Sequence, residues 1–576
     1  MVNVVKREEK WYNIYSYTKG EYMSKIRFFG LGGLGENGKN MYICEVDNNI
    51  FILDAGLKYP SVDLLGIDAV YPDMTYLEEH RNNIQGIFLS HGHEDHIGAV
   101  VEVLKRFNIS VYGTHFTISI LEDNITEAGL NIKDYKLYRI NEDKVLKFGT
   151  VKVEFYNVSH SIPEAINIAI ITKDGCIVYA PDFSFDVNND RRYQISFNRI
   201  NDISKYGVLA VCPESLGTSN TTRTSSNTEL DYAVRKAVLR KGRVFFTVFS
   251  TDLEKIQRVI DISVKNGRRV ALIGRKTQRI VNIAIERGYL KTPQDKLVSL
   301  KFRDEVITNE DPDLAIIITG ARHEPFYMLQ RMCNGQDRLL QLNKTDEVLL
   351  LTPPVPGTER IAARTMGIVL ESGANIIQLS KDSLRSAHAN PSNLKMLYSM
   401  LKPKYIIPII GEYRHQYQQK NVAIDAGYNP NNIIILDNGQ VAEFENGTYK
   451  GSLNKVSTGD VLVDGSIIGD INEVVLKDRE VLSEEGIMFV SLSVDLKKRR
   501  FLGGPEIVSR GFNAENIEDI IEEMKHITVD TVYSYLNKKN LELNLAIEYL
   551  RDKLNSYVYK TTKKRPIIIP SIIDIK

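Results

Sequence analysis

The stretch His91-Gly92-His93-Glu94-Asp95-His96 places three imidazoles and the Asp95 carboxylate on one short loop. Zinc and manganese bind imidazole nitrogens and carboxylate oxygens, and without a cation such a cluster would leave buried polar atoms unpaired. A solvated polar turn is the alternative interpretation. The apolar run 87–89 before the loop is typical of a buried strand, and residues 97–101 after it open a helix. The stretch therefore predicts a metal site at a strand end of an α/β sheet.

The spacing within the loop separates two groups of ligands. His91 and His93 alternate across the turn and can converge on one ion. Asp95 and His96 fall on the helical side, where they can hold a second ion a few ångströms away. The loop therefore favours a site for two ions.

Further motifs follow in order along nearly the whole chain. They are GLGGLGENGKNMY (30–42), DAG (54–56), NVSHSIP (157–163), PDFSFD (181–186), PPVPGTE (353–359), GEYR (411–414) and GPEIVSRGF (504–512). Together with the H-x-H-x-D-H signature, this series resembles ribonuclease J, a β-CASP nuclease of the metallo-β-lactamase superfamily. The resemblance implies an αββα sandwich with an inserted β-CASP α/β domain and a small C-terminal α+β domain.

The resemblance also implies a complete ligand set. His160 joins His91 and His93 at the first ion, Asp182 bridges the two ions, and Asp95 and His96 hold the second. Taken alone, His160 is equally well a satisfied histidine at a strand end. Asp182 follows the apolar run 176–180, and a carboxylate at a strand exit needs a cation nearby, although a turn-forming aspartate is the alternative.

Several positions depart from the family pattern. Ile410 stands where the family has a histidine that binds the second metal, and an alkyl side chain cannot coordinate. The stretch Leu384-Arg385-Ser386-Ala387-His388 keeps Ser386 and His388 but loses the first imidazole of the phosphate-binding motif. The other departures replace polar or small residues by charged ones: Asp252, Glu254, Arg322 and His323. Since carboxylates repel phosphate, these changes predict a weakened paralogue, like the second member of the ribonuclease J pair of some bacteria.

The composition agrees with a large soluble protein. Lys plus Arg and Asp plus Glu both number 73 in 576 residues, so RNA would be attracted by a local groove and not by an overall basic field. The four cysteines have no paired spacing, which indicates a reducing compartment. No apolar run is long enough to cross a bilayer, and the N-terminus lacks the apolar core of a signal peptide. We expect a cytoplasmic protein without a membrane partner.

Changes in pattern suggest domain boundaries. We predict an N-terminal extension (1–24), a metallo-β-lactamase domain in two parts (25–220 and 352–450), the β-CASP domain (221–351), a linker (451–464) and a C-terminal α+β domain (465–576). The polar, hydroxyl-rich stretch 217–227 marks the first internal boundary, and Gly, Ser, Asn and Lys mark the linker.

The function implied is metal-assisted hydrolysis of RNA, by 5′-to-3′ exonuclease and endonuclease cleavage, with reduced activity. Asp95, Asp182 and His388 are expected to carry catalysis, and Arg385, Ser386, His388 and Arg414 to bind RNA phosphate. His388 is a general acid or only a phosphate ligand, and Arg414 is equally an internal partner of Glu412. One or two Zn²⁺ ions are expected, with Mn²⁺ as the alternative.

Two other functions stay open at this point. The chain could be a largely inactive subunit that binds and stabilises an active ribonuclease J. Under either function, the resemblance implies a homodimer or a hetero-oligomer with a ribonuclease J paralogue. A small-molecule hydrolase is disfavoured by the second α/β domain.

Overall fold

The computed structural model describes residues 3–5, 24–61, 63–185, 190–219, 227–274, 278–298, 311–338, 340–354, 358–380, 383–452, 454–469, 471–538 and 543–575. The chain forms two compact units, one of residues 1–59 and 70–461 and one of residues 60–69 and 462–576. The first unit contains two lobes, which we call the sandwich lobe and the inserted lobe.

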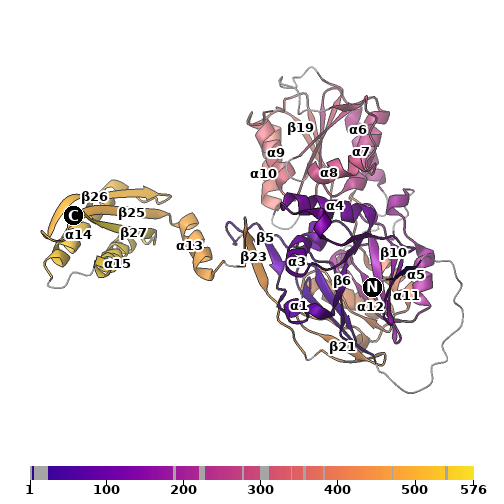
Figure 1. Cartoon of the computed structure of the whole chain (residues 1–576). Coiled ribbons are helices and arrows are strands. Elements are labelled where there is room, and N and C mark those ends of the chain that lie inside the picture. The colour runs from indigo at the N-terminus through magenta and orange to yellow at the C-terminus, as the bar shows by residue number, and fades with distance from the viewer. Residues whose placement is uncertain are drawn as a thin grey trace. The chain divides into compact units, whose positions relative to one another are not determined.

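Two mixed β-sheets pack face to face at the centre of the sandwich lobe (Figure 1). Within the described residues, the first sheet has the order β22-β21-β2-β3-β4-β6-β7-β8: β22 (Thr448–Gly451), β21 (Ala442–Glu445), β2 (Lys25–Gly32), β3 (Met41–Val46), β4 (Asn49–Leu53), β6 (Ile84–Phe88), β7 (Val111–Gly113) and β8 (Leu137–Arg139). The second has the order β1-β9-β10-β11-β12-β13-β20: β1 (Asn3–Val5), β9 (Val145–Phe148), β10 (Val151–Asn157), β11 (Ile166–Thr172), β12 (Gly175–Ala180), β13 (Val208–Pro213) and β20 (Tyr405–Ile406).

Helices cover the outer face of each sheet, so the strands are buried on both faces. Phe28 faces the second sheet, while its neighbour Phe29 packs toward the helices of the first. Such strands are continuous apolar runs, as the sequence of β12 shows. The helices of the lobe are α1 (Thr75–Glu79), α2 (Glu94–Ile97), α3 (Val100–Phe107), α4 (His115–Glu127), α5 (Phe197–Ser204), α11 (Pro391–Leu401) and α12 (Tyr413–Asp425), and the short strand β5 (Ala69–Pro72) precedes α1. The predicted αββα sandwich is confirmed.

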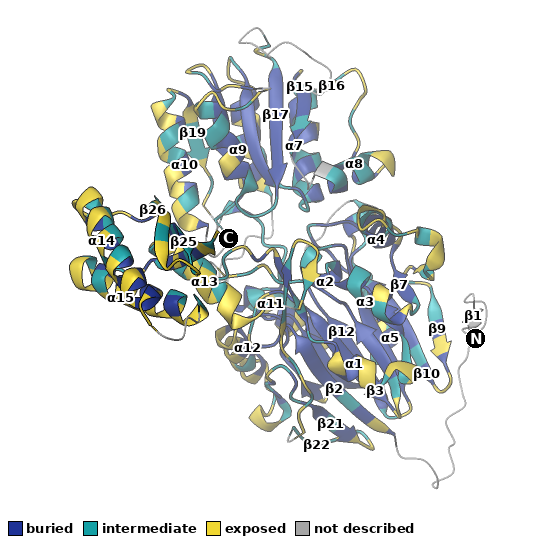
Figure 2. Ribbon diagram, turned by 60° about the vertical axis from the view of Figure 1, so that its left-hand side comes forward, coloured by how far each residue is buried: buried dark blue, intermediate teal, exposed yellow. Residues whose placement is uncertain are grey.

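The inserted lobe is a parallel sheet with helices on both faces (Figure 2). Its order is β16-β15-β17-β14-β18-β19 in the described residues: β14 (Val244–Phe249), β15 (Arg269–Ile273), β16 (Leu297–Val298), β17 (Leu314–Gly320), β18 (Glu347–Leu350) and β19 (Asn375–Gln378). Phe245 of β14 packs with α9 and α10, and the neighbouring Val244 and Phe246 face the other side. The helices are α6 (Thr228–Val238), α7 (Leu253–Lys265), α8 (Gln278–Glu286), α9 (Glu324–Cys333) and α10 (Glu359–Glu371).

The structure differs from two predicted boundaries. The insertion does not end at 351, because α10 and β19 continue its sheet as far as Gln378. A four-residue edge strand carries too weak a pattern to be recognised beforehand. The stretch 451–464 is not entirely a linker either, since Asp460–Asp464 forms β23. Residues 6–23 of the predicted extension lie outside the described residues, and Asn3–Val5 pair with β9.

The second unit is an α+β domain, as predicted. Its sheet has the order β26-β25-β27, and its core lies between that sheet and the last two helices. The elements are β24 (Ile467–Ile468), α13 (Glu473–Glu484), β25 (Ile487–Asp495), β26 (Arg500–Arg510), α14 (Ile517–Leu536), α15 (Leu543–Thr562) and β27 (Ile567–Asp574). None of the helices in the described ranges is long and apolar enough to cross a membrane.

Candidate metal centre

The loop between β6 and α2 carries the metal-site motif. Backbone hydrogen bonds from the residues just before β3 and just after β4 hold this loop in place. The backbone of Asp95 accepts a hydrogen bond from Asn40 N (3.1 Å), and that of His96 accepts one from Ala55 N (2.8 Å). A Cβ on Gly56 would lie 1.6 Å from the Asp95 carbonyl oxygen. Only glycine therefore allows the two segments to approach this closely.

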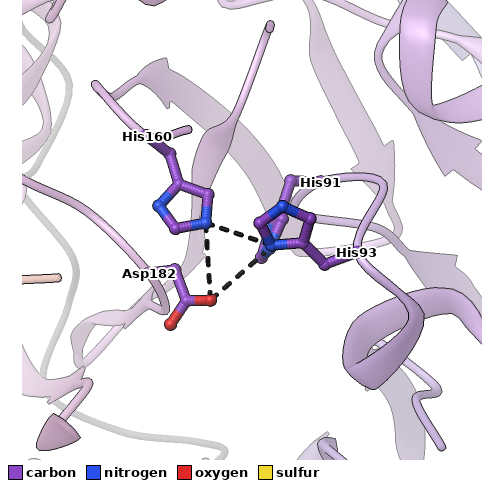
Figure 3. Close-up of side chains that lie close together, drawn as sticks. All are labelled: His91, His93, His160 and Asp182. Atoms are coloured by element: carbon purple, nitrogen blue, oxygen red, sulfur yellow. Dashed lines mark hydrogen bonds and ion pairs between the residues drawn. The ribbon is translucent and has the colours of Figure 1, made fainter. Parts of the chain in front are cut away.

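Four side chains from three segments converge on one point, which we call the first donor group (Figure 3). His93 Nδ1 lies 3.0 Å from His91 Nε2 and 3.1 Å from His160 Nε2. Asp182 Oδ2 lies 3.5 Å from His91 Nε2 and 3.6 Å from His160 Nε2. Asp182 follows β12, and His160 follows β10, so both stand at strand ends beside the loop.

These four atoms fit a tetrahedral cation. Metal–ligand bonds of about 2.0–2.1 Å place tetrahedral ligand atoms about 3.3–3.4 Å apart, close to the separations found here. The other nitrogens of His91 and His160 donate to Ser90 Oγ (2.9 Å) and to the Ala387 carbonyl (2.9 Å). These bonds leave the inward nitrogens with free lone pairs, as metal ligation requires.

The imidazoles of the first donor group are neutral at pH 7. Burial lowers the pKa of His93 to about 4 and that of His160 to about 3. Burial and the neighbouring imidazoles also hold the pKa of His91 well below its usual value. Because metal ions bind unprotonated imidazole, this group is ready to accept a cation.

A second donor group consists of Asp95, His96 and again Asp182. His96 Nε2 lies 3.4 Å from Asp182 Oδ2 and 3.6 Å from Asp95 Oδ2. The Asn40 amide nitrogen lies 3.2 Å from the same His96 nitrogen. Burial lowers the pKa of His96, but Asp95 and Asp54 more than offset this, so the pKa lies well above its usual value. The second donor group thus has three donor residues, of which Asp182 is shared with the first group and His96 has a raised pKa.

Ile410, where the resemblance implies a histidine ligand, is fully buried in the apolar cluster between the two sheets. Its amide contacts the Tyr42 hydroxyl (3.2 Å), which in turn contacts Asn40 Oδ1 (3.3 Å). The backbone of Ile410 has φ +53°, an unfavourable conformation for a β-branched residue that histidine and asparagine tolerate better. The isoleucine therefore packs in an apolar cluster while its backbone adopts a conformation that is unfavourable for a β-branched residue.

Asp54, to which the sequence assigned no role, supports both donor groups. Its carboxylate accepts hydrogen bonds from His96 Nδ1, the Ser90 hydroxyl and the Tyr179 hydroxyl, each 2.7 Å long. It also accepts one from Ser90 N (2.7 Å). The residue fixes the ring of His96 and the start of the loop at once. Its position directly after β4 is the feature of the sequence that could have indicated this role.

Glu214, also missed, holds His388 beside the centre. Glu214 Oε2 accepts from His388 Nδ1 (2.7 Å), and its other oxygen accepts from the amides of Phe183 (2.8 Å) and Ala389 (2.9 Å). Asp182 Oδ1 is 3.3 Å from the same His388 nitrogen. Burial lowers the pKa of His388, but the two carboxylates outweigh it and raise the pKa well above its usual value. Glu214 follows β13 just as Asp182 follows β12, which was the available signal.

The residues predicted to bind phosphate do not all lie beside the donor groups. Arg385 is 8% exposed and donates to both oxygens of Glu254 (2.8 Å each), so it is engaged inside the protein. Arg414 is exposed and pairs with Glu412 (2.7 Å). Ser386 contacts the backbone of His388. Only His388 among these residues reaches the donor atoms themselves.

The remaining departures from the family pattern have local partners. Asp252 caps α7 by accepting from Lys255 N (3.1 Å). Arg322 lies over the ring of Tyr59, 5.1 Å from its centroid, and the Tyr59 hydroxyl donates to Glu94 of the metal-site loop. His323 lies at the start of α9, and its ring contacts that of Tyr327.

Comparison with known proteins identifies families along most of the chain. Residues 34–160 match the metallo-beta-lactamase superfamily, and residues 381–435 match the Zn-dependent metallo-hydrolase RNA specificity domain. Residues 241–368 match the ribonuclease J beta-CASP domain, and residues 474–575 match the ribonuclease J C-terminal domain.

Whole-chain relatives agree with these matches. The chain is 34% identical over 552 residues to ribonuclease J2 of Bacillus subtilis strain 168, covering 96% of this chain and 99% of that protein. It is equally similar to ribonuclease J 2 of Staphylococcus aureus strain NCTC 8325, with 96% and 98% covered. A crystal structure of a protein of unknown function from Enterococcus faecalis V583 covers 73% of this chain and 100% of that one, at 15% identity and a TM-score of 0.50, which bears on the fold alone.

Proposed function

Because the chain belongs to the ribonuclease J family of metal-dependent ribonucleases, we propose that it cleaves RNA phosphodiester bonds from the 5′ end and internally at the centre around Asp182. The observation that carries this proposal is the convergence of His91, His93, His160 and Asp182 on one point. The histidine and carboxylate donors suit zinc, with manganese as the alternative. The described residues that would hold it are those of the first donor group, and Asp95 and His96 would join Asp182 at a second ion.

A cation bound there would supply an acidified water and positive charge against the phosphate. The chain's own residues supply the rest. Glu214 orients His388 through Nδ1, which keeps the imidazole protonated and turned toward the centre. His388 is thereby suited to donate a proton to the leaving oxygen, as a general acid requires. Ser386, two residues away, is a candidate donor to a non-bridging phosphate oxygen.

We further propose that the activity is low. Ile410 offers no ligand to the second donor group, and Arg385, which the resemblance implies in phosphate binding, pairs with Glu254. These same two observations favour the alternative function, a largely inactive subunit that pairs with an active ribonuclease J in the cytoplasm. Under either function the chain would act as a homodimer or in a hetero-oligomer with such a paralogue.

Asp182→Ala separates the two functions. We expect the purified wild-type protein to digest 5′-monophosphorylated single-stranded RNA and the variant to lose at least about 1,000-fold in rate, equivalent to about 4 kcal/mol, because both donor groups lose a shared ligand. Glu154→Gln, which breaks a buried pair with Arg199 in the same lobe, is the matched control for folding. If neither wild type nor variant digests RNA but both still bind an active ribonuclease J, the subunit function replaces the enzymatic one.

A further inference from the structure

The Arg385–Glu254 ion pair connects the two lobes of the first unit beside the metal centre. Arg385 belongs to the sandwich lobe, and its Nη2 donates to the hydroxyls of Ser159 (2.8 Å) and Ser184 (3.2 Å). Glu254 belongs to α7 of the inserted lobe and accepts from Arg385 Nη1 with both oxygens. Both side chains are largely buried, at 8% and 15% exposed. The Glu254 carboxylate therefore occupies the Nη1 edge of a guanidinium that two serine hydroxyls hold through Nη2.

This ion pair adjoins the first donor group. His160 donates to the carbonyl of Ala387, two residues after Arg385, and Ser161 Oγ lies 3.4 Å from His93 Nε2. Glu254 N contacts the Ser161 carbonyl (3.4 Å). An anion bound to Arg385 would consequently lie next to the residues proposed to hold the cation.

The site has no room for a phosphate as it stands. The cavity beside the ion pair, lined by residues that include Ser161, Asp252, Glu254, Lys255 and Arg385, has a volume of about 20 Å³. A space of this size accommodates about one water molecule. A phosphate therefore has to displace the Glu254 carboxylate before it can reach the guanidinium.

The other cations that line the cavity are also paired with carboxylates. Lys255 contacts Asp252 (2.5 Å), and Arg258 contacts Asp231 (3.0 Å) and Glu254 (3.7 Å). Guanidinium groups bind carboxylates and phosphates through the same hydrogen-bond geometry, so one anion can replace the other. If phosphate replaces Glu254 on Arg385, the Glu254 carboxylate loses its ion-pair partner. It then lies close to the negative charge of the bound phosphate.

We propose that Glu254 is a specificity-determining residue that acts as an internal substitute for substrate phosphate on Arg385. It excludes RNA phosphate groups from Nη1 of Arg385 unless their binding displaces the carboxylate. The proposal rests on the proposed ribonuclease function, because the phosphate it excludes belongs to the RNA cleaved at the neighbouring centre. The residue thereby sets both the affinity for RNA and the preference for a phosphorylated end.

The test uses Glu254→Gln in the full-length, metal-loaded protein, with inorganic phosphate as the probe. Glutamine keeps the shape and one acceptor for Arg385 but removes the negative charge. We expect phosphate to bind the variant at least tenfold more tightly in calorimetry, and to raise its melting temperature more than that of the wild type. The double variant Glu254→Gln with Arg385→Ala should lose this gain, because the guanidinium is the group released.

A second ion pair between the lobes provides the matched control. Arg279 of α8 donates to Asp123 of α4 (2.8 Å from Nε), away from the donor groups. Asp123→Asn also removes one carboxylate between the lobes, but it should leave phosphate affinity unchanged. If Glu254→Gln folds poorly, Glu254→Asp tests the same point, since its shorter side chain withdraws the carboxylate and should give a smaller gain in the same direction.

The RNA assay separates this proposal from the proposed function. With 5′-monophosphorylated and 5′-hydroxyl RNA, Glu254→Gln should raise kcat/KM for the phosphorylated substrate about tenfold more than for the other. A gain in phosphate affinity in a protein that digests no RNA would sink the ribonuclease function and keep the phosphate site. Unchanged phosphate affinity in Glu254→Gln, in a protein that does digest RNA, would overturn the role of Glu254.

Discussion

The two donor groups of the metal centre share Asp182 but differ in their surroundings. The first donor group combines three neutral imidazoles whose outer nitrogens are bonded to neighbouring oxygens. The second combines His96, whose pKa is raised, with Asp95 and the shared Asp182, and Ile410 lies where the resemblance implies another ligand. The comparison teaches that a complete sequence motif does not guarantee two equal sites. We expect the number of ligands and the proton on His96 to decide which group retains an ion.

The strongest test of this difference removes one histidine from each donor group and compares the metal content of the two variants. We expect His160→Ala to remove the bound ion and to lower RNA hydrolysis at least about 1,000-fold, or about 4 kcal/mol, because only three donors remain. His96→Ala should retain one ion per chain, since the first donor group is intact. Metal content measured by mass spectrometry, together with hydrolysis rates, tests both variants. Equal metal loss in the two variants would show that the groups are not distinct.

The next prediction restores the missing ligand. Ile410→His should raise the metal content from one ion to two per chain and increase RNA hydrolysis about 10- to 100-fold, the range in which altered ligand surroundings act. The φ of +53° favours histidine over isoleucine at this position, so the variant is expected to fold. Ile410→Val, which offers no ligand, is the control and should remain at one ion. A variant that stays at one ion with unchanged activity would show that this position does not limit the second site.

Central strands were predictable from local pattern, whereas the arrangement of domains was implied by the resemblance to ribonuclease J. The apolar run 176–180 lies within β12, and the apolar run 87–89 overlaps the end of β6. The αββα sandwich, the inserted α/β domain and the C-terminal α+β domain are confirmed. The end of the insertion was predicted wrongly because β19 is a short, half-exposed edge strand. Continuous apolar runs indicate central strands, whereas edge strands carry little signal of their own.

The site could be predicted only in part, because its hydrogen bonds join distant segments. The motif loop, His160 and Asp182 were recognisable, and the structure brings them together, although their role as ligands stays a prediction. Asp54 and Glu214 received no role, since nothing in the sequence shows that Asp54 meets His96 or that Glu214 meets His388, 174 residues later. Arg385 was predicted to bind phosphate, but its partner Glu254, 131 residues earlier, was visible only in three dimensions.

The smallest expected effect is the pH dependence of metal affinity, which should differ between the two donor groups. His91, His93 and His160 have pKa values below the usual 6.5, so at pH 7 they bind a cation without releasing a proton. His96 has a raised pKa because Asp95 and Asp54 outweigh the effect of burial, so a cation must first expel its proton. Affinity of the second donor group should therefore rise with pH above pH 7, while affinity of the first stays constant. Titration of the metal-free protein with Zn²⁺ at pH 7 and pH 8.5 measures the affinities of both donor groups. Parallel pH dependence in the two groups would mean that His96 is neutral despite its carboxylate neighbours, and the proton would then have no part in keeping the second site weak.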